Sequence, residues 1–194
     1  MTAVIAIPDT VPRYGEIQYR AATVEAIDPD EGTVLLRAAP YDIETQLTTD
    51  LWESFAPAAF SRAAEAPHRV KLFHNHPSMG GALIGHAREV EDRPDGVWVR
   101  AKFSQTAAGL EARELALDGS LDQCSVEFRA LPAWYRVTRK RDGLHVRHSR
   151  GHLLGVALVP HGAYDGAAFV ASVRDSTADH RREEVIAALR AMRA

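Results

Sequence analysis

The sequence has a single cysteine, Cys124, and therefore cannot form an internal disulfide bond. Such sparing use of cysteine is typical of proteins in a reducing compartment. No apolar run is long enough to span a membrane, and the N-terminus lacks the basic segment and the long apolar core of a signal peptide. These absences exclude a disulfide scaffold, and we expect a soluble intracellular protein without a membrane partner.

An excess of positive charge is also missing, because the formal net charge of the 194 residues is −3. The sequence therefore gives no electrostatic reason to expect a nucleic-acid partner. It contains no Gly-x-Ser-x-Gly elbow, no Walker loop and no dinucleotide fingerprint, which removes several common enzyme classes.

Alternating apolar and polar residues are the main pattern that is present. They predict strands at residues 16–27, 33–39, 41–47, 70–74, 83–91, 97–103, 123–136, 144–148 and 152–159. Helical spacing predicts a short helix at 57–64 and longer helices at 106–117 and 181–193. Many short strands with few helices predict a mainly β fold with peripheral helices (α+β), in which strands close into a barrel. We expect one domain over residues 1–173, followed by a polar linker and an amphipathic C-terminal helix over 174–194.

Ser125 and a pair of histidines are the main candidates for chemistry. Ser125 lies in an alternating strand segment, whereas His74 and His76 end an apolar strand about fifty residues earlier. A serine on one strand and a histidine ending another are a possible nucleophile and base, or two ordinary residues. Strand alternation places His74 and His76 on one face, where His86 would complete a metal site, although no acidic residue is spaced as a companion. Cys124 is an alternative nucleophile that points away from Ser125.

Several segments, in their order along the chain, resemble the prohead (capsid maturation) serine protease family of tailed phages. They are residues 37–42 (RAAPYD), 53–60 (ESFAPAAF), 71–76 (KLFHNH), 84–85 (IG), 95–97 (DGV), 124–128 (CSVEF) and 154–164 (LGVALVPHGAY). The resemblance extends over residues 19–170. It implies a fold like that of the herpesvirus assemblin proteases, an antiparallel β-barrel surrounded by helices. It also implies that Ser125 is the nucleophile and His76 the general base.

The third catalytic position departs from the family pattern. Where the family has a glutamate the chain has Gly155, and where the family has a glycine the chain has Glu127, so the two residue types have exchanged places. Glu127 and Ser125 share one strand face. We hypothesise that Glu127 orients His76; the alternatives are a solvated Glu127 beside a Ser–His dyad, or a degenerate site. By the same resemblance, backbone N–H groups of Gly162 and Ala163 are candidate oxyanion donors.

The function implied by the resemblance is a serine endopeptidase that forms an acyl-enzyme and needs no cofactor and no metal. Its expected substrates are the scaffolding segment of the major capsid protein and the chain itself, cut within residues 174–180. It would act in the host cytoplasm, inside the assembling prohead, and a homodimer is possible. An inactive family member that serves as a scaffold or assembly factor is the alternative, supported by Gly155. A histidine-rich metal-binding β-barrel is a third reading.

Overall fold

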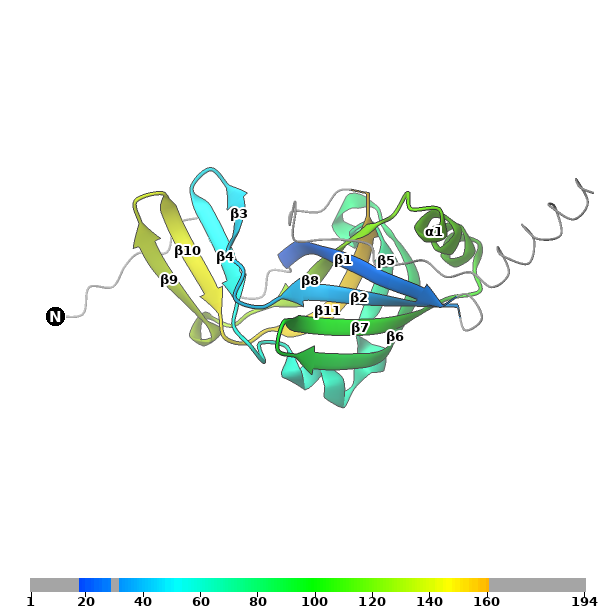
Figure 1. The fold of residues 1–194 in the computed structure, drawn as a ribbon, viewed down its shortest axis with the longest axis horizontal. Coiled ribbons are helices and arrows are strands. Elements are labelled where there is room, and N and C mark those ends of the chain that lie inside the picture. Colours follow the sequence, from blue (N-terminus) through cyan, green and yellow to red (C-terminus); the bar gives the residue numbers. More distant parts are fainter. Residues whose placement is uncertain (1–17, 29–31, 161–194) are drawn as a thin grey trace, which may run out of the picture.

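A closed barrel of seven strands forms the body of the molecule (Figure 1). The computed structural model describes residues 18–28 and 32–160, with side chains from residue 32 onward. Around the barrel the strands follow the order β1 (Gln18–Asp28), β2 (Thr33–Pro40), β7 (Gly96–Phe103), β6 (Ala82–Arg93), β5 (Lys71–His74), β11 (His152–Val159) and β8 (Gln123–Arg129), which pairs with β1 again. All ladders are antiparallel except that between β5 and β11.

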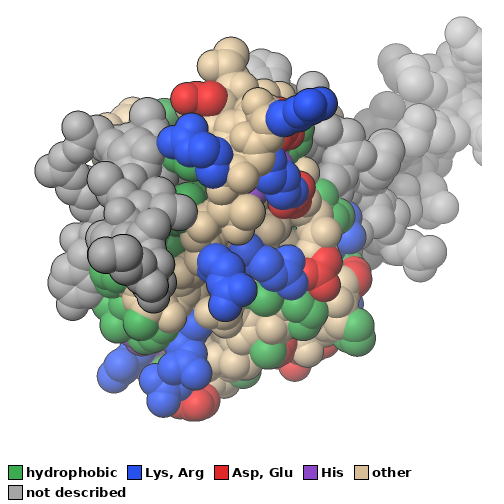
Figure 2. All heavy atoms as spheres, turned by 90° about the vertical axis from the view of Figure 1, so that its left-hand side faces the viewer, with side chains coloured by type: hydrophobic (Ala, Val, Ile, Leu, Met, Phe, Trp, Pro, Cys, Tyr) green, Lys and Arg blue, Asp and Glu red, His purple; other side chains and the backbone are tan. Residues whose placement is uncertain are grey.

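Four further strands form a separate sheet, which we call the wing, beside the barrel (Figure 1). Its order is β3 (Thr45–Thr48), β4 (Leu51–Phe55), β10 (Gly143–His148) and β9 (Tyr135–Lys140), and β10 runs parallel to β4. On the face that the wing presents, Lys and Arg side chains lie beside Asp and Glu side chains (Figure 2). Ion pairs of the wing include Lys140 with Glu44 and Arg147 with Asp42.

One α-helix and four short 3-10 helices accompany the strands in the described part of the chain. In α1 (Ala107–Leu117), the Thr106 side chain caps the first turn by accepting a hydrogen bond from the Gly109 N–H at 3.2 Å. A Cβ at Gly109 would lie 2.1 Å from the Ser104 carbonyl oxygen, so glycine allows α1 to approach the barrel closely. The 3-10 helices are η1 (Ser61–Glu65), η2 (Pro67–Arg69), η3 (Pro77–Met79) and η4 (Pro132–Trp134).

The barrel core is apolar and continuous. Its fully buried members include Leu36, Leu72, Ile84, Phe103 and Phe128, each at 0–1% exposure. Burying such side chains contributes about 1.5–3 kcal/mol each to folding. Among the described residues, no helix has both the length and the apolar character needed to cross a membrane.

The mainly β barrel expected from the sequence is confirmed, as is the helix at 106–117. Four details differ from what the sequence led us to expect. The strand expected at 41–47 begins only at Thr45, as β3. The strand β4 was not predicted, because the buried polar residues Glu53 and Ser54 hide its pattern. The helix at 57–64 is a 3-10 helix that begins at Ser61. The strand at 123–136 is divided into β8 and β9 around Pro132. The linker and helix expected at 174–194 lie outside the described residues, as does the end of the 1–173 domain.

Candidate active site

Ser125 and Glu127 lie on the outer face of β8. The alternating residues Cys124, Val126 and Phe128 are 0% exposed and belong to the barrel core. Successive side chains of a strand point to opposite faces, so Ser125 and Glu127 project together from the other face, about 7 Å apart along the strand. Cys124 is therefore a core residue on the face opposite Ser125, which removes it as an alternative nucleophile at this site.

The histidine of the site follows the end of β5. The strand ends at His74, and Asn75 has a left-handed φ of 58° while its N–H donates to the Leu158 carbonyl at 2.9 Å. His76 is the residue before η3, and its carbonyl accepts from the Met79 and Gly81 N–H groups at 2.8 and 2.9 Å. The expectation that His74 and His76 share one strand face is wrong, because the turn at Asn75 interrupts the alternation.

His76 and Glu127 form a buried pair. The His76 Nδ1 lies 3.1 Å from the Glu127 Oε1, and the residues are 6% and 4% exposed. A carboxylate oxygen accepts hydrogen bonds, so this contact favours the ring tautomer that carries its hydrogen on Nδ1. Ser125, at 5% exposure, shares the strand face of Glu127. The structure thus brings this imidazole to the same face of β8 as the Ser125 hydroxyl.

Gly155 lies directly across the ladder from Glu127. The two residues are register partners between β11 and β8, and Lys71 of β5 is the partner of Gly155 on the other side. A Cβ at Gly155 would lie 2.8 Å from the Phe73 Cε2 and 3.0 Å from the Lys71 carbonyl oxygen. An exchange of glutamate and glycine between these two positions, which the family resemblance implies, would therefore move a carboxylate by one strand spacing, about 4.8 Å, within a single cross-strand row.

The metal site considered for His74, His76 and His86 does not form in the part of the chain described by the structure, where no group of three His, Cys, Asp or Glu residues is placed to hold an ion. His86 is the register partner of Lys71, and Lys71 lies three residues before His74 on β5. The candidate oxyanion residues Gly162 and Ala163 lie outside the described residues. A pocket of about 350 Å³ is lined by residues of η1, η2 and the start of β11, and by none of Ser125, His76 and Glu127.

A second buried Glu–His pair was not predicted from the sequence. Glu53 of β4 and His148 of β10 are each 1% exposed, with the His148 Nε2 2.8 Å from the Glu53 Oε1. The rings of Phe55, Phe128 and Tyr135 surround His148. The pair thus joins the wing to the barrel core. In the sequence, the one hint of this pair was that Glu53 lies in the segment 53–60, which resembles the family.

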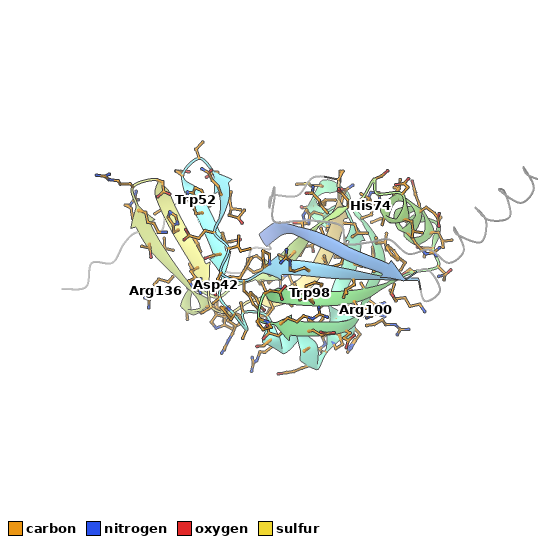
Figure 3. All side chains as sticks on the ribbon, in the orientation of Figure 1. Asp42, Trp52, His74, Trp98, Arg100 and Arg136 are labelled. Atoms are coloured by element: carbon orange, nitrogen blue, oxygen red, sulfur yellow. The ribbon has the colours of Figure 1, made fainter. Side chains whose placement is uncertain are left out.

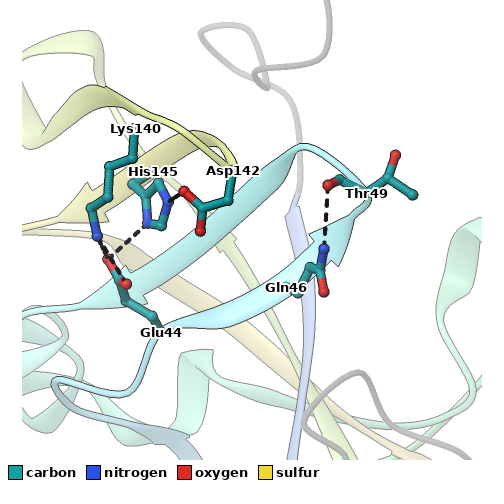
Figure 4. Close-up of polar contacts among 6 residues, drawn as sticks. All are labelled: Glu44, Gln46, Thr49, Lys140, Asp142 and His145. Atoms are coloured by element: carbon teal, nitrogen blue, oxygen red, sulfur yellow. Dashed lines mark hydrogen bonds and ion pairs between the residues drawn. The ribbon is translucent and has the colours of Figure 1, made fainter.

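A third histidine lies between two carboxylates on the wing (Figure 4). The His145 Nδ1 is 3.0 Å from the Glu44 Oε1, and its Nε2 is 3.1 Å from the Asp142 Oδ1. The hydrogen bond with His145, followed by that with Lys140, lowers the pKa of Glu44, and the bond with His145 lowers that of Asp142. Through its two ring nitrogens, His145 links the Glu44 and Asp142 carboxylates and so holds parts of the wing together.

Comparison with known proteins tests the resemblance to the family. No curated protein matches the chain. Among solved structures, the capsid assembly protease gp21 of bacteriophage T4 is similar with a TM-score of 0.47 and 10% identity, over 74% of this chain and 97% of the T4 chain. The caudovirus prohead serine protease family matches residues 23–183. Because this match includes most of the chain and every strand that carries a candidate residue, the resemblance is confirmed: the chain belongs to the caudovirus prohead serine protease family, the serine peptidases of phage capsid maturation.

Proposed function

We propose that the chain is an endopeptidase in which Ser125 is the nucleophile, His76 the general base and Glu127 the residue that positions His76. One observation carries the proposal: the buried hydrogen bond of 3.1 Å between His76 and Glu127, on the strand face that also bears Ser125. A serine hydroxyl attacks a peptide carbonyl efficiently only when a positioned imidazole accepts its proton.

In the proposed reaction, the Ser125 Oγ attacks the scissile carbonyl carbon while its proton passes to the Nε2 of His76. The imidazolium then donates this proton to the leaving amine, the C–N bond breaks, and an acyl-enzyme remains on Ser125. Water attacks the ester with His76 again as the base, which releases the carboxylate and restores Ser125. Glu127 holds the Nδ1–H tautomer and stabilises the imidazolium, and the N–H groups of Gly162 and Ala163 are the proposed oxyanion donors.

The proposed substrates are the scaffolding segment of the major capsid protein, inside the assembling prohead, and the chain itself. The register of β11 supports self-processing, because Leu158 is the partner of His74 and β11 ends at the next residue. The last described strand therefore ends close to the position of His76. The proposed cut lies in the segment 174–180, whose polar composition is typical of segments that proteases cleave.

A serine-reactive phosphonate probe, combined with intact-mass measurement, tests the proposal. We expect the probe to label the wild-type chain at Ser125, and the loss of both label and self-cleavage in Ser125→Ala. The matched control is Ser104→Ala, which removes a half-buried serine from the barrel outside the proposed site. Absence of label on a folded wild-type chain would contradict the peptidase and favour an inactive assembly factor.

A further inference from the structure

Three basic residues lie side by side on neighbouring strands of the barrel. Lys71 of β5 is the register partner of His86 of β6, which is in turn the partner of Lys102 of β7. Partners across a ladder project from the same face of a sheet. Because Leu72 and Ala87, which follow two of them, are buried in the core at 0% and 1% exposure, these three residues face outward. We call Lys71, His86 and Lys102 the basic row.

The basic row lacks the acidic partners that a neighbouring row has. In that neighbouring row, Glu89 of β6 is the register partner of Arg100 of β7, and the Arg100 Nε lies 3.4 Å from the Glu89 Oε2. Within residues 32–160, no salt bridge joins a carboxylate to Lys71, His86 or Lys102. The positive charges of Lys71 and Lys102, two strand spacings apart, are therefore not compensated by a carboxylate of the described residues and can attract an external anion.

The pKa of His86 reflects the positive charges around it on this face. Burial lowers the pKa of His86, and the charges of Arg88, Lys71, His68 and Lys102 lower it further. His86 is consequently neutral at neutral pH, and Lys71, Lys102 and Arg88 carry the charge. The Lys71 ammonium donates to the His68 carbonyl oxygen at 2.9 Å, a neutral acceptor that leaves its charge uncompensated.

The basic row continues into the proposed active site. Lys71 is the partner of Gly155, which is the partner of Glu127. Two strand spacings, about 10 Å, separate Lys71 from Glu127, and four spacings, about 19 Å, separate Lys102 from Glu127. An extended peptide rises about 3.3 Å per residue, so a bound segment would cover these distances with about three to six residues.

The row that contains Ser125 has a different character. Ala157, Phe73 and Leu83 follow Ser125 in register across β11, β5 and β6, and Leu83 is 57% exposed. An apolar row and a basic row thus run next to each other on one face, about 7 Å apart, and both lead to the proposed site. This surface suits an extended segment that carries both apolar and acidic side chains.

We propose that the basic row binds an acidic stretch of the protein substrate, placed about three to six residues from the bond that Ser125 attacks; this inference rests on the proposed function. A nucleic acid fits the surface less well. From Lys71 to Lys102 the row is only about 10 Å wide. Single strands bind to exposed aromatic platforms, whereas the ring of Trp98 on β7 is covered by the Arg93 guanidinium at 4.2 Å.

Binding of a labelled acidic peptide to the full chain tests the inference. The protein carries Ser125→Ala, so that the probe is not cut, and the probe is a short fluorescein-labelled peptide of glutamate and glycine whose affinity is read by fluorescence anisotropy. We expect the variant Lys71→Gln/Lys102→Gln to bind about tenfold more weakly, since each exposed ion pair contributes up to about 1 kcal/mol. The matched control, Arg136→Gln/Arg139→Gln, removes the same charge from β9 on the wing, where Arg136 lies away from the barrel (Figure 3), and should change affinity by less than about twofold.

Two further measurements distinguish an acidic peptide from a nucleic acid as the ligand of the basic row. Peptide binding should weaken with salt and should raise the pKa of His86, followed by its imidazole NMR resonances in the wild-type background, because a bound anion offsets the neighbouring charges. Equal losses in both double variants, an unchanged His86 titration, or tighter binding of a short oligodeoxynucleotide than of the acidic peptide would overturn the inference.

The same variants separate this inference from the proposed function. If the phosphonate probe labels Ser125 but the double variant Lys71→Gln/Lys102→Gln binds the acidic peptide as well as its parent, the inference fails while the peptidase stands. If binding of the peptide depends on the basic row but Ser125 is never labelled, the proposed function fails while the basic row stands as a docking surface for an acidic segment.

Discussion

Replacing Glu127 by glutamine removes the charge of the buried pair while keeping its size and an acceptor oxygen. At 3.1 Å and an effective dielectric constant of about 20, a full imidazolium–carboxylate pair is worth about 5 kcal/mol. That energy corresponds to about four powers of ten in rate if it acts only when His76 is protonated. The variant retains part of this energy, because the glutamine side-chain oxygen still accepts a hydrogen bond from the Nδ1–H of His76. We therefore expect Glu127→Gln to slow acylation of Ser125 by a factor between about 10² and 10⁴.

The assay is the rate at which a phosphonate probe labels Ser125, measured on protein whose folding has been checked by circular dichroism and thermal unfolding. Glu53→Gln is the matched control, because Glu53 forms an equally buried pair with His148, at 2.8 Å. The Glu53→Gln variant should have a lower free energy of unfolding, because breaking a buried pair is costly. The folded fraction of this variant should still be labelled at the wild-type rate.

The pH dependence supplies a second test of the same reasoning. A neutral glutamine stabilises the imidazolium less than a carboxylate does, so the pH–rate profile of the variant should rise at a lower pH than that of the wild type. Labelling of Glu127→Gln at the wild-type rate with an unshifted profile would refute the role assigned to Glu127, and Ser125 and His76 would then act as a dyad.

Three other changes have expected outcomes. Gly155→Ala places a Cβ 2.8 Å from the Phe73 ring, and it should lower the free energy of unfolding by about 1–3 kcal/mol in a denaturant titration; an unchanged midpoint would show that the ring moves aside freely. Because the contact with His145 lowers the Glu44 pKa from its ordinary 4.5, the stability it contributes is present above pH 4.5 and is lost as the pH falls through the lower folded value. Thermal melts at decreasing pH should show this loss in the wild type and a flatter dependence in Glu44→Gln, and identical curves would contradict it. Asn75, at φ 58°, should accept glycine with little loss of labelling, whereas Asn75→Val should reduce both stability, by about 1–2 kcal/mol, and labelling; equal behaviour of the two variants would show that this turn does not set the position of the site.

Much of the barrel could be predicted because its strands face solvent on one side. Period-two alternation located β2, β6, β7 and β11, and it also placed Ser125 and Glu127 on one face. Local chemistry located α1, where Thr106 provides a cap and Gly119 adopts the left-handed conformation after the last turn. These features depend on residues close together in the chain.

The remainder depended on contacts between distant residues. Glu53 meets His148 only because β4 runs parallel to β10, and a parallel pairing of strands so far apart leaves no local pattern. His76 could not be placed by alternation because the left-handed turn at Asn75 ends the strand before it. The buried polar side chains of Glu53 and Ser54 also concealed β4, and the partner of Glu53, His148, lies 95 residues away in the sequence.

The pairing of Gly155 with Glu127 depends on a single irregularity in β11. Leu153 is the register partner of Phe128, so a regular antiparallel ladder would set Leu154 against Glu127, whereas the observed register skips one residue and sets Gly155 there. A side chain at that position would meet the Phe73 ring, so glycine fits there without displacing the ring. Within one cross-strand row, a carboxylate on either strand lies within about one strand spacing of the same imidazole. On the proposed function, Glu127 supplies from this row the one buried acceptor that the Nδ1–H of His76 requires, although neither Glu127 nor Gly155 matches the pattern that the family resemblance implies.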